Sequence, residues 1–336
     1  MPPAPPPTRD ALTEPLIARP APGTPRPAGP PGASGEADSG TAPRARAALR
    51  AMRLHQWAKN GLVALPALLA HDASPEAWGR VAAAFLALGL VASGTYVVND
   101  LVDRERDRLH PTKRRRPFAS GALRPAFGRA LAPVLVAAGF ALAWAALPGA
   151  FVGALALYLV TTLAYSFKLK ALVIVDVVVL AGLYALRVLA GGAATGIAVS
   201  EWLLAFSLFF FLGLALLKRY AELRVLQKNV GARDNGRGYT VEDAAMLRAI
   251  GPAVGFMAVL VFALYVTSPA VAELYARPAL LWLAAPLLAY WTMRAWMLAH
   301  RGDMPDEPVA FALRDPASYA VAALTAGVLA LASVPV

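Results

Sequence analysis

With 336 residues, 58% of them hydrophobic and 16% charged, and a mean hydropathy of +0.53, the chain is too apolar to be a water-soluble protein. It has no cysteine, which excludes disulfides and thiolate metal sites, and its four scattered histidines make a zinc site a poor prediction. Its formal net charge of +11 is compatible with nucleic-acid binding, but basic cytoplasmic loops would give a membrane protein the same excess.

Residues 1–43 form a proline-rich segment, with 13 of the 28 prolines of the chain. Glycine, alanine and serine fill the gaps, so this stretch can neither bury a core nor hold a helix. It lacks the continuous apolar run of a signal peptide, and its scattered arginines are typical of a cytoplasmic segment. We expect residues 1–43 to be a disordered cytoplasmic tail and residues 44–336 to be one transmembrane domain.

Nine apolar segments follow the tail, and most are long enough to cross a hydrocarbon layer of roughly 30 Å as helices. The first is short and contains Pro66. The predicted fold is therefore all-α and integral to the membrane, with about nine transmembrane helices. The segments lie near 60–70, 80–98, 127–147, 150–166, 172–193, 202–217, 249–268, 279–298 and 317–335.

The loops between these segments differ in charge. If the N-terminus is cytoplasmic, so are loops 99–126, 167–171, 218–248 and 299–316, and these hold nearly all the loop lysines and arginines. This asymmetry follows the positive-inside rule and accounts for the basic charge without a nucleic-acid partner. It predicts a multi-pass protein of the plasma (inner) membrane, with the charged loops inside and the C-terminus outside.

Three aspartates follow the second segment. Asp100, Asp103 and Asp107 are spaced i, i+3, i+7, which would place them on one helical face, with Asn99 one turn before Asp103. Such close carboxylates repel, and hard oxygen ligands favour Mg²⁺, which commonly takes further ligands from water and phosphate. In the alternative interpretation they are solvated loop acids, paired with Arg104, Arg106 and Arg108.

Several cations stand near the same membrane face. Lys113 and Arg116 belong to a run of four cations that can bind phosphate oxygens, or can serve only as topological anchors. Lys59 follows Trp57 before the first segment, and Lys218 and Arg219 close the sixth; each pair is also compatible with simple anchoring at the interface.

The fifth segment contains two charges in otherwise apolar sequence, Asp176 and Arg187. Eleven residues separate them, so they share a helix face roughly 16 Å apart and should not pair directly. Buried intramembrane ions usually line a cavity or bond to a neighbouring helix. We expect Asp176, nearer the cytoplasmic end, to line a cavity, with interhelical bonding as the alternative.

These residues together resemble the UbiA superfamily of intramembrane prenyltransferases, over roughly residues 50–335. Asn99-Asp100-x-x-Asp103-x-x-x-Asp107 is similar to the first aspartate-rich motif of that family, followed by Arg116-Pro117. The resemblance implies helices around a central cavity, Asp100, Asp103 and Asp107 as catalytic residues, and Mg²⁺ held by them and Asn99.

Within the superfamily the chain most resembles the decaprenyl-phosphate phosphoribosyltransferase branch, through Gln56-Trp57-x-Lys59-Asn60, the run 110–114, Tyr165-Ser166 and the run 218–223. The resemblance implies transfer of a phosphoribosyl group from phosphoribosyl pyrophosphate to a polyprenyl phosphate. The residues expected to bind substrate are Lys59, Asn60, Asn99, Lys113, Arg116, Tyr165, Lys168, Asp176, Lys218, Arg219 and Glu222.

Two departures bear on this interpretation. First, this chain has Lys218, Arg219 and Glu222 where related enzymes that use prenyl diphosphates carry a second aspartate-rich motif. Second, His55 occupies the position at which the phosphoribosyltransferase branch has a cation. The first departure weakens the alternative of prenyl transfer to an aromatic or other small acceptor. A transporter is a third possibility, but the paired internal repeats common in transporters are not evident.

Overall fold

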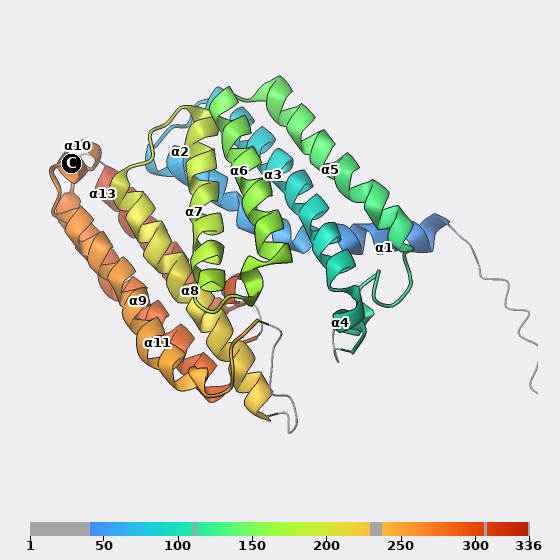
Figure 1. Cartoon of the computed structure of the whole chain (residues 1–336). Helices are drawn as coiled ribbons and strands as arrows, with labels where there is room; N and C mark the ends of the chain where they lie inside the picture. Colours follow the sequence, from blue (N-terminus) through green and yellow to red (C-terminus); the bar gives the residue numbers. More distant parts are fainter. Residues whose placement is uncertain (1–40, 110–112, 229–236, 306–307, 335–336) are drawn as a thin grey trace, which may run out of the picture. The chain divides into compact units, whose positions relative to one another are not determined.

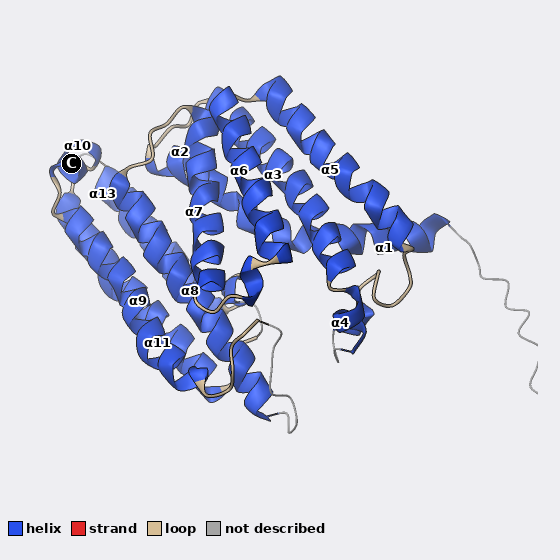
Figure 2. Cartoon of the chain, in the orientation of Figure 1, coloured by secondary structure: helices blue, strands red, loops and turns tan. Residues whose placement is uncertain are grey.

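The computed structural model describes residues 41–109, 113–228, 237–305 and 308–334, and these ranges contain helices and connecting loops only (Figures 1 and 2). The predicted tail falls outside the described residues except for Thr41, Ala42 and Pro43. These three begin helix α1 (Thr41–Met52), which buries Ala47 and Ala51 in a cluster with Val97 and Phe118. The compact unit that contains the described helices therefore begins at Thr41.

Seven helices of the described chain are long and apolar enough to cross a membrane. They confirm the prediction of an all-α integral membrane protein and coincide with seven of the nine predicted segments. The helices are α3 (Pro75–Val102), α5 (Pro125–Ala146), α6 (Gly149–Phe167), α7 (Val175–Thr195), α8 (Glu201–Lys228), α9 (Asp243–Val266) and α13 (Pro316–Ser333).

The other two predicted segments are helical but not single α-helices. Segment 279–298 is divided between a 3₁₀-helix, η4 (Pro278–Leu283), and α11 (Ala284–Arg301). Segment 60–70 combines the end of a 3₁₀-helix, η1 (Leu54–Ala64), with the short α2 (Leu65–Leu69). The expectation of nine regular transmembrane helices is therefore approximate.

The 3₁₀ geometry explains how so short a first segment reaches across the bundle. At about 2.0 Å per residue, η1 extends roughly 22 Å, and α2 adds about 7 Å. η1 packs against both α3 and α7. Trp57 donates a 3.0 Å hydrogen bond to Ser93, and the Val63 backbone lies so close to Gly191 that a Cβ there would meet the Val63 carbonyl oxygen at 2.2 Å.

Helices α3 and α7 lie at the centre of the bundle. Each buries most of its apolar window, whereas α6, α9 and α13 bury less than a quarter of theirs, as expected for lipid-facing helices. One buried cluster joins α3, α6 and α7, and another joins α7, α8, α9 and α11. The polar residues carried by α3 and α7 are consequently held in the interior.

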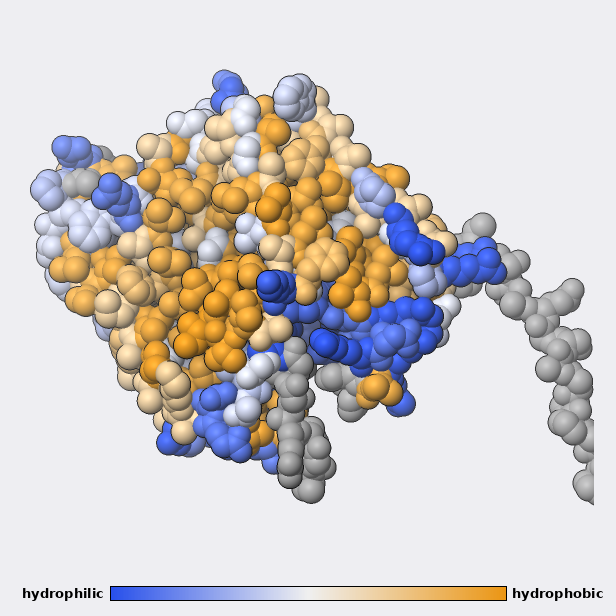
Figure 3. All heavy atoms as spheres, viewed as in Figure 1, coloured by the Kyte–Doolittle hydropathy of each residue, from blue (hydrophilic) through white to orange (hydrophobic). Residues whose placement is uncertain are grey.

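Polar side chains gather at the end of the bundle that carries α4 (Arg104–Leu109), whereas the helix flanks are hydrophobic (Figure 3). The short helices η2 (Lys113–Arg115), η3 (Leu169–Ala171) and α12 (Pro308–Ala312) follow helices that run toward this same end. At the opposite end α10 (Pro269–Leu274) follows α9. This distribution agrees with the predicted loop asymmetry.

Candidate active site

The aspartate motif spans a helix junction rather than one continuous face. Helix α3 ends at Val102, Asp103 is its C-cap, and Asp107 lies on α4. Helix-like backbone hydrogen bonds continue through the junction, from Asp103 N to the Asn99 carbonyl (2.9 Å) and from Asp107 N to the Asp103 carbonyl (2.8 Å). The prediction of a single helical face was wrong in this respect, although the side chains remain near one another.

Each motif aspartate is paired with a cation. Arg116 donates to Asp100 at 3.3 Å and to Asp107 at 2.7 Å, and Arg53 also binds Asp100. Lys170, on η3, reaches both oxygens of Asp103 at 2.7 and 2.8 Å and the side chain of Asn99 at 3.3 Å. These six side chains and Asn99 constitute the aspartate cluster.

Burial contradicts the interpretation of these residues as solvated loop acids. Asp100 is 2% exposed and Asp107 is 4% exposed. Arg104 and Arg108 form their ion pairs with Glu105 instead. The carboxylates therefore belong to the interior of the site, with Arg116 as their predicted neighbour.

The donor set of the aspartate cluster fits a hard divalent cation. All its potential ligands are oxygens, and Asp100 Oδ2 is buried without a hydrogen-bond partner. In the described residues no three acidic or imidazole groups are gathered closely enough to hold an ion as they stand. Arg53, Arg116 and Lys170 neutralise the carboxylates that a metal would bind.

A second polar group joins α6, α7 and α8. Arg219 is fully buried and binds Asp176 on α7 and Glu222 on its own helix, and it donates to the Tyr165 hydroxyl at 3.2 Å. The other oxygen of Asp176 accepts a 2.6 Å hydrogen bond from Tyr239. Asp176 thus has 0% exposure and bonds between helices, so the expectation that it lines a cavity was wrong.

The segment before α9 completes this second group. Arg237 donates to the Tyr165 hydroxyl at 2.8 Å and lies 3.8 Å from Glu222. Gly238 adopts φ +76 and lies so close to Ala171 that a Cβ would meet its carbonyl oxygen at 2.7 Å, so glycine is required between Arg237 and Tyr239. Burial and the hydrogen bond to Asp176 raise the pKa of Tyr239, which therefore stays protonated.

Lys113 connects the two groups electrostatically. Burial, together with the positive charges of Arg237 and Arg116, lowers the pKa of Lys113, while Glu222 and Asp107 oppose that shift. Because Arg116 and Asp107 belong to the aspartate cluster and Arg237 and Glu222 to the second group, Lys113 lies within electrostatic reach of both. Half-buried Lys218 precedes Arg219 on α8.

A third polar group lies deeper in the bundle. Arg187 on α7 donates to Asn60 at 3.1 Å and to the Tyr158 hydroxyl at 2.9 Å. Lys59 lies 6.0 Å from the centre of the Tyr184 ring. Asp176 and Arg187 thus have different partners, as their spacing predicted.

Sequence reasoning missed four residues of the site and misplaced one. Arg53, Lys170, Arg237 and Tyr239 were not selected. Lys170, Arg237 and Tyr239 belong to loops whose charges were counted only for topology, and Arg53 precedes the first predicted segment. Lys168 was expected to bind substrate but is exposed at the end of α6, whereas Lys170 contacts the aspartates. Only the fold could distinguish the two lysines.

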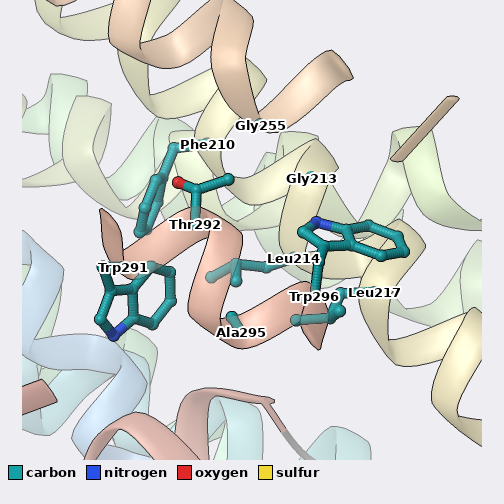
Figure 4. A pocket seen from close by; sticks show the side chains of 9 residues that line it. All are labelled: Phe210, Gly213, Leu214, Leu217, Gly255, Trp291, Thr292, Ala295 and Trp296. Carbon is teal, nitrogen blue, oxygen red and sulfur yellow. The ribbon is translucent and has the colours of Figure 1, made fainter. Parts of the chain in front are cut away.

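An apolar pocket lies apart from these polar groups, between α8, α9 and α11 (Figure 4). Phe210, Trp291 and Trp296 line it, and its one hydroxyl, on Thr292, donates to the Leu288 carbonyl. With no charged lining residue, this pocket cannot bind a phosphate.

Comparison with known proteins identifies the family and the fold. Residues 61–319 match the model of the UbiA prenyltransferase family. The chain belongs to that family. This confirms the predicted resemblance and identifies the chain as a membrane transferase rather than a transporter.

Several proteins resemble this UbiA family member along the sequence. It is 37% identical over 286 residues to the uncharacterized protein y4nM of Sinorhizobium fredii, covering 84% of this chain but only 55% of y4nM. It is 38% identical over 272 residues to nodulation protein NoeC of Azorhizobium caulinodans, covering 80% and 87% of the two chains. A decaprenyl-phosphate phosphoribosyltransferase of Mycobacterium tuberculosis is 37% identical over 198 residues, covering 57% and 65%.

Solved structures support the fold. A UbiA homolog from Archaeoglobus fulgidus, bound to GPP and Mg²⁺, matches with a TM-score of 0.62 and 17% identity, covering 84% of this chain and 99% of that one. The same homolog bound to DMAPP and Mg²⁺ gives a TM-score of 0.61. At this identity the likeness concerns the UbiA fold alone.

Proposed function

We propose that this UbiA family member transfers a phosphoribosyl group from phosphoribosyl pyrophosphate to a polyprenyl phosphate. The observation that carries the proposal is the cationic character of the second group. Among the described residues, Lys113, Lys218, Arg219 and Arg237 lie near the acids Asp176 and Glu222. Such a concentration of cations suits a donor with a second phosphate besides its diphosphate.

The proposed reaction exchanges one carbon–oxygen bond for another. An anionic phosphate oxygen of the lipid bonds to the anomeric carbon of the donor, and the bond from that carbon to the diphosphate oxygen breaks. The electron pair leaves with the diphosphate, so no proton transfer is needed. Catalysis then depends on orienting the two substrates and on stabilising charge on the leaving group.

The aspartate cluster is the proposed diphosphate site. Asp100, Asp103, Asp107 and Asn99 would hold Mg²⁺, which supplies Lewis-acid stabilisation of the leaving oxygens when bound. Arg53, Arg116 and Lys170 already contact these carboxylates. A small displacement of their side chains would let them bind phosphate oxygens instead. Charge-assisted contacts of this kind are about twice as strong as neutral hydrogen bonds.

The second group is the proposed site for the other phosphate of the donor. Asp176 and Tyr239 hold Arg219 in place from α7 and the pre-α9 segment. Arg219, Lys218 and Lys113 would bind phosphate, while Tyr165 orients Arg219 and Arg237 through its hydroxyl. Lys168 is retained only as a peripheral contact because it is exposed.

The proposed cellular arrangement follows from the loop charges. The enzyme lies in the plasma membrane with the aspartate cluster facing the cytoplasm, where a water-soluble phosphorylated sugar is available. The polyprenyl chain lies along the apolar flanks of the helices. Residues 1–40 are proposed to contribute nothing to catalysis, because their composition cannot offset the entropy of ordering.

A direct transfer assay tests the proposal. Purified protein in detergent is given radiolabelled phosphoribosyl pyrophosphate and a polyprenyl phosphate with Mg²⁺, and a parallel sample is given a prenyl diphosphate with aromatic acids. Labelled lipid and released diphosphate are expected in the first sample only. Product in the second sample alone would refute phosphoribosyl transfer and favour the prenyltransferase alternative, for which the GPP-bound structure of the Archaeoglobus homolog is the precedent.

A further inference from the structure

Arg187 is a buried cation in the membrane interior whose hydrogen-bond acceptors are all uncharged. It is 5% exposed and donates to the Asn60 side chain (3.1 Å), the Leu183 carbonyl (2.6 Å) and the Tyr158 hydroxyl (2.9 Å). None of the ion pairs within the described ranges includes Arg187. Arg219, which is fully buried, binds two carboxylates.

A second cation approaches the same place. The Arg187 guanidinium lies 4.8 Å from the Tyr158 ring and 5.4 Å from the Tyr184 ring, and the Lys59 ammonium lies 6.0 Å from the Tyr184 ring. Aromatic faces attract cations but cannot neutralise them. Arg187 therefore remains a cation in a region of low dielectric with no carboxylate bonded to it among the described residues, which favours the entry of an anion; Lys59 adds a second cation nearby.

Asn60 adds an unused donor at this place. Its side-chain oxygen accepts from Arg187, while its Nδ2 is buried without an acceptor among the described residues, at 1% exposure. A buried donor left unpaired costs about 1–3 kcal/mol. An anion placed against Nδ2 would therefore satisfy Asn60 and neutralise Arg187 together.

The site lies on the membrane side of the aspartate cluster. Arg53 binds Asp100 and also lies 5.3 Å from the ring of Tyr96, one helical turn deeper on α3. Tyr96 packs against the buried cluster that contains Tyr158. A group bound by Arg187 would therefore approach the reaction centre from the hydrophobic side.

We infer that Arg187, Asn60 and Lys59 bind the phosphate of the acceptor lipid. A phosphate monoester carries a charge of about −1.5 to −2 at neutral pH, which matches two cations better than a carboxylate would. Arginine also binds phosphate oxygens in pairs. This inference rests on the proposed function, because it assigns one substrate of that reaction to its own subsite.

Binding without the sugar donor tests the inference. The probe is farnesyl phosphate, its neutral control is farnesol, and the readout is the dissociation constant on purified full-length protein. Wild type should bind farnesyl phosphate and bind farnesol at least about tenfold more weakly. Asn60→Asp gives Arg187 an internal carboxylate, so it should remain folded and bind farnesyl phosphate about tenfold or more weakly, as should Arg187→Gln.

Arg294→Gln is the matched control, since Arg294 is a part-buried helix arginine that binds Asp315 between α11 and α13. It should leave the dissociation constant unchanged. Lys59→Gln, at a half-buried position, gives a third measurement if either interior variant fails to fold. Equal affinity for farnesyl phosphate and farnesol, or unchanged affinity in the folded variants, would overturn the inference.

Two further outcomes separate the inference from the proposed function. Arg187-dependent binding of farnesyl phosphate without phosphoribosyl transfer would refute the function and leave the site standing. Transfer by wild type, with undiminished lipid-phosphate affinity in the variants, would refute the site alone. If 4-hydroxybenzoate rather than farnesyl phosphate binds in an Arg187-dependent manner, the assignment to a phosphate is wrong.

Discussion

Lys170 donates to both carboxylate oxygens of Asp103, at 2.7 and 2.8 Å. Asp103 is the junction between α3 and α4, so this contact ties the short η3 segment to the point where the motif changes direction. An ion pair at such a junction fixes the positions of the aspartates on either side of it. The geometry of the motif thus depends on a loop 67 residues away in the chain.

Asp100→Asn and Asp103→Asn should each abolish turnover while leaving the protein folded in detergent. Each change removes one negative charge from the proposed metal site and preserves side-chain volume. The measurement is Mg²⁺-dependent diphosphate release, with Glu105→Gln as the control because exposed Glu105 pairs with Arg104 and Arg108 rather than with the aspartate cluster. Near-normal activity of both aspartate variants would refute the metal assignment.

Arg219→Ala should raise the apparent KM for the phosphorylated donor by roughly ten- to a hundredfold, since a lost charge-assisted contact costs about 1.5–3 kcal/mol. Removal also leaves Asp176 buried without its cation, so thermal stability should fall as well. Arg224→Ala, on the same helix but bonded to the His300 carbonyl, is the control and should leave KM unchanged. An unchanged KM in Arg219→Ala would show that this group does not bind the donor.

Cysteine labelling should place the polar end of the bundle in the cytoplasm. Ser120, after η2, and Ser200, between α7 and α8 at the opposite end of the bundle, are both exposed. Each is replaced by cysteine in a separate variant, Ser120→Cys and Ser200→Cys. In intact cells an impermeant maleimide should modify the residue-200 cysteine and not the residue-120 cysteine. The reverse pattern would invert the orientation.

Deletion of residues 2–40 should change catalysis in detergent by less than about twofold, because a segment of this composition cannot offset the entropy of ordering. Extending the deletion through residue 52 removes α1 and exposes Val97 and Phe118, so this longer deletion should lower thermal stability. Rates and melting temperatures of the two truncations provide the comparison. A tenfold loss of activity in the shorter one would assign the tail a role in the site.

Asp315→Ala should destabilise the contact between α11 and α13 by about 1–3 kcal/mol. Asp315 accepts from Arg294 at 2.7 and 2.9 Å and caps α13 through Ser318 N at 2.8 Å. Burial alone would raise the pKa of Asp315, but hydrogen bonds from Arg294 and Ser318 hold it below its ordinary value.

Because this pKa is lowered on folding, the stabilisation is present above the ordinary pKa of about 4 and is lost as the pH falls through the lowered value. Thermal unfolding at pH 7 should therefore show the full difference between wild type and Asp315→Ala, and the difference should shrink toward pH 3. Exposed Asp303→Ala should match wild type at both pH values. A difference that grows on acidification would contradict the assignment.

The sequence was sufficient for the parts of the fold that depend on composition along a single segment. Long apolar runs predicted seven helices, and loop charge predicted which ends of those helices are polar. The positions of the interrupted segments at 60–70 and 279–298 were predicted correctly. Their helix type was not, since hydropathy does not distinguish a 3₁₀-helix from an α-helix.

The site was predictable where its residues form a motif and not where they meet through folding. Asp100, Asp107 and Arg116 lie close in the chain and were found together. Arg53, Lys170 and Arg237 reach the site from separate loops, and nothing local distinguishes them from the anchoring cations expected at this membrane face.

The 3₁₀ form of η1 has a consequence for the motif it carries. With three residues per turn, side chains spaced by three are eclipsed in a straight row along the helix. Trp57, Asn60 and Val63 occupy one such row: the side chains of Trp57 and Asn60 bond to Ser93 and Arg187, and the Val63 backbone lies against Gly191. In an α-helix each of these residues would be rotated away from the one before it. The 3₁₀ conformation of the backbone therefore determines which neighbours the three residues contact.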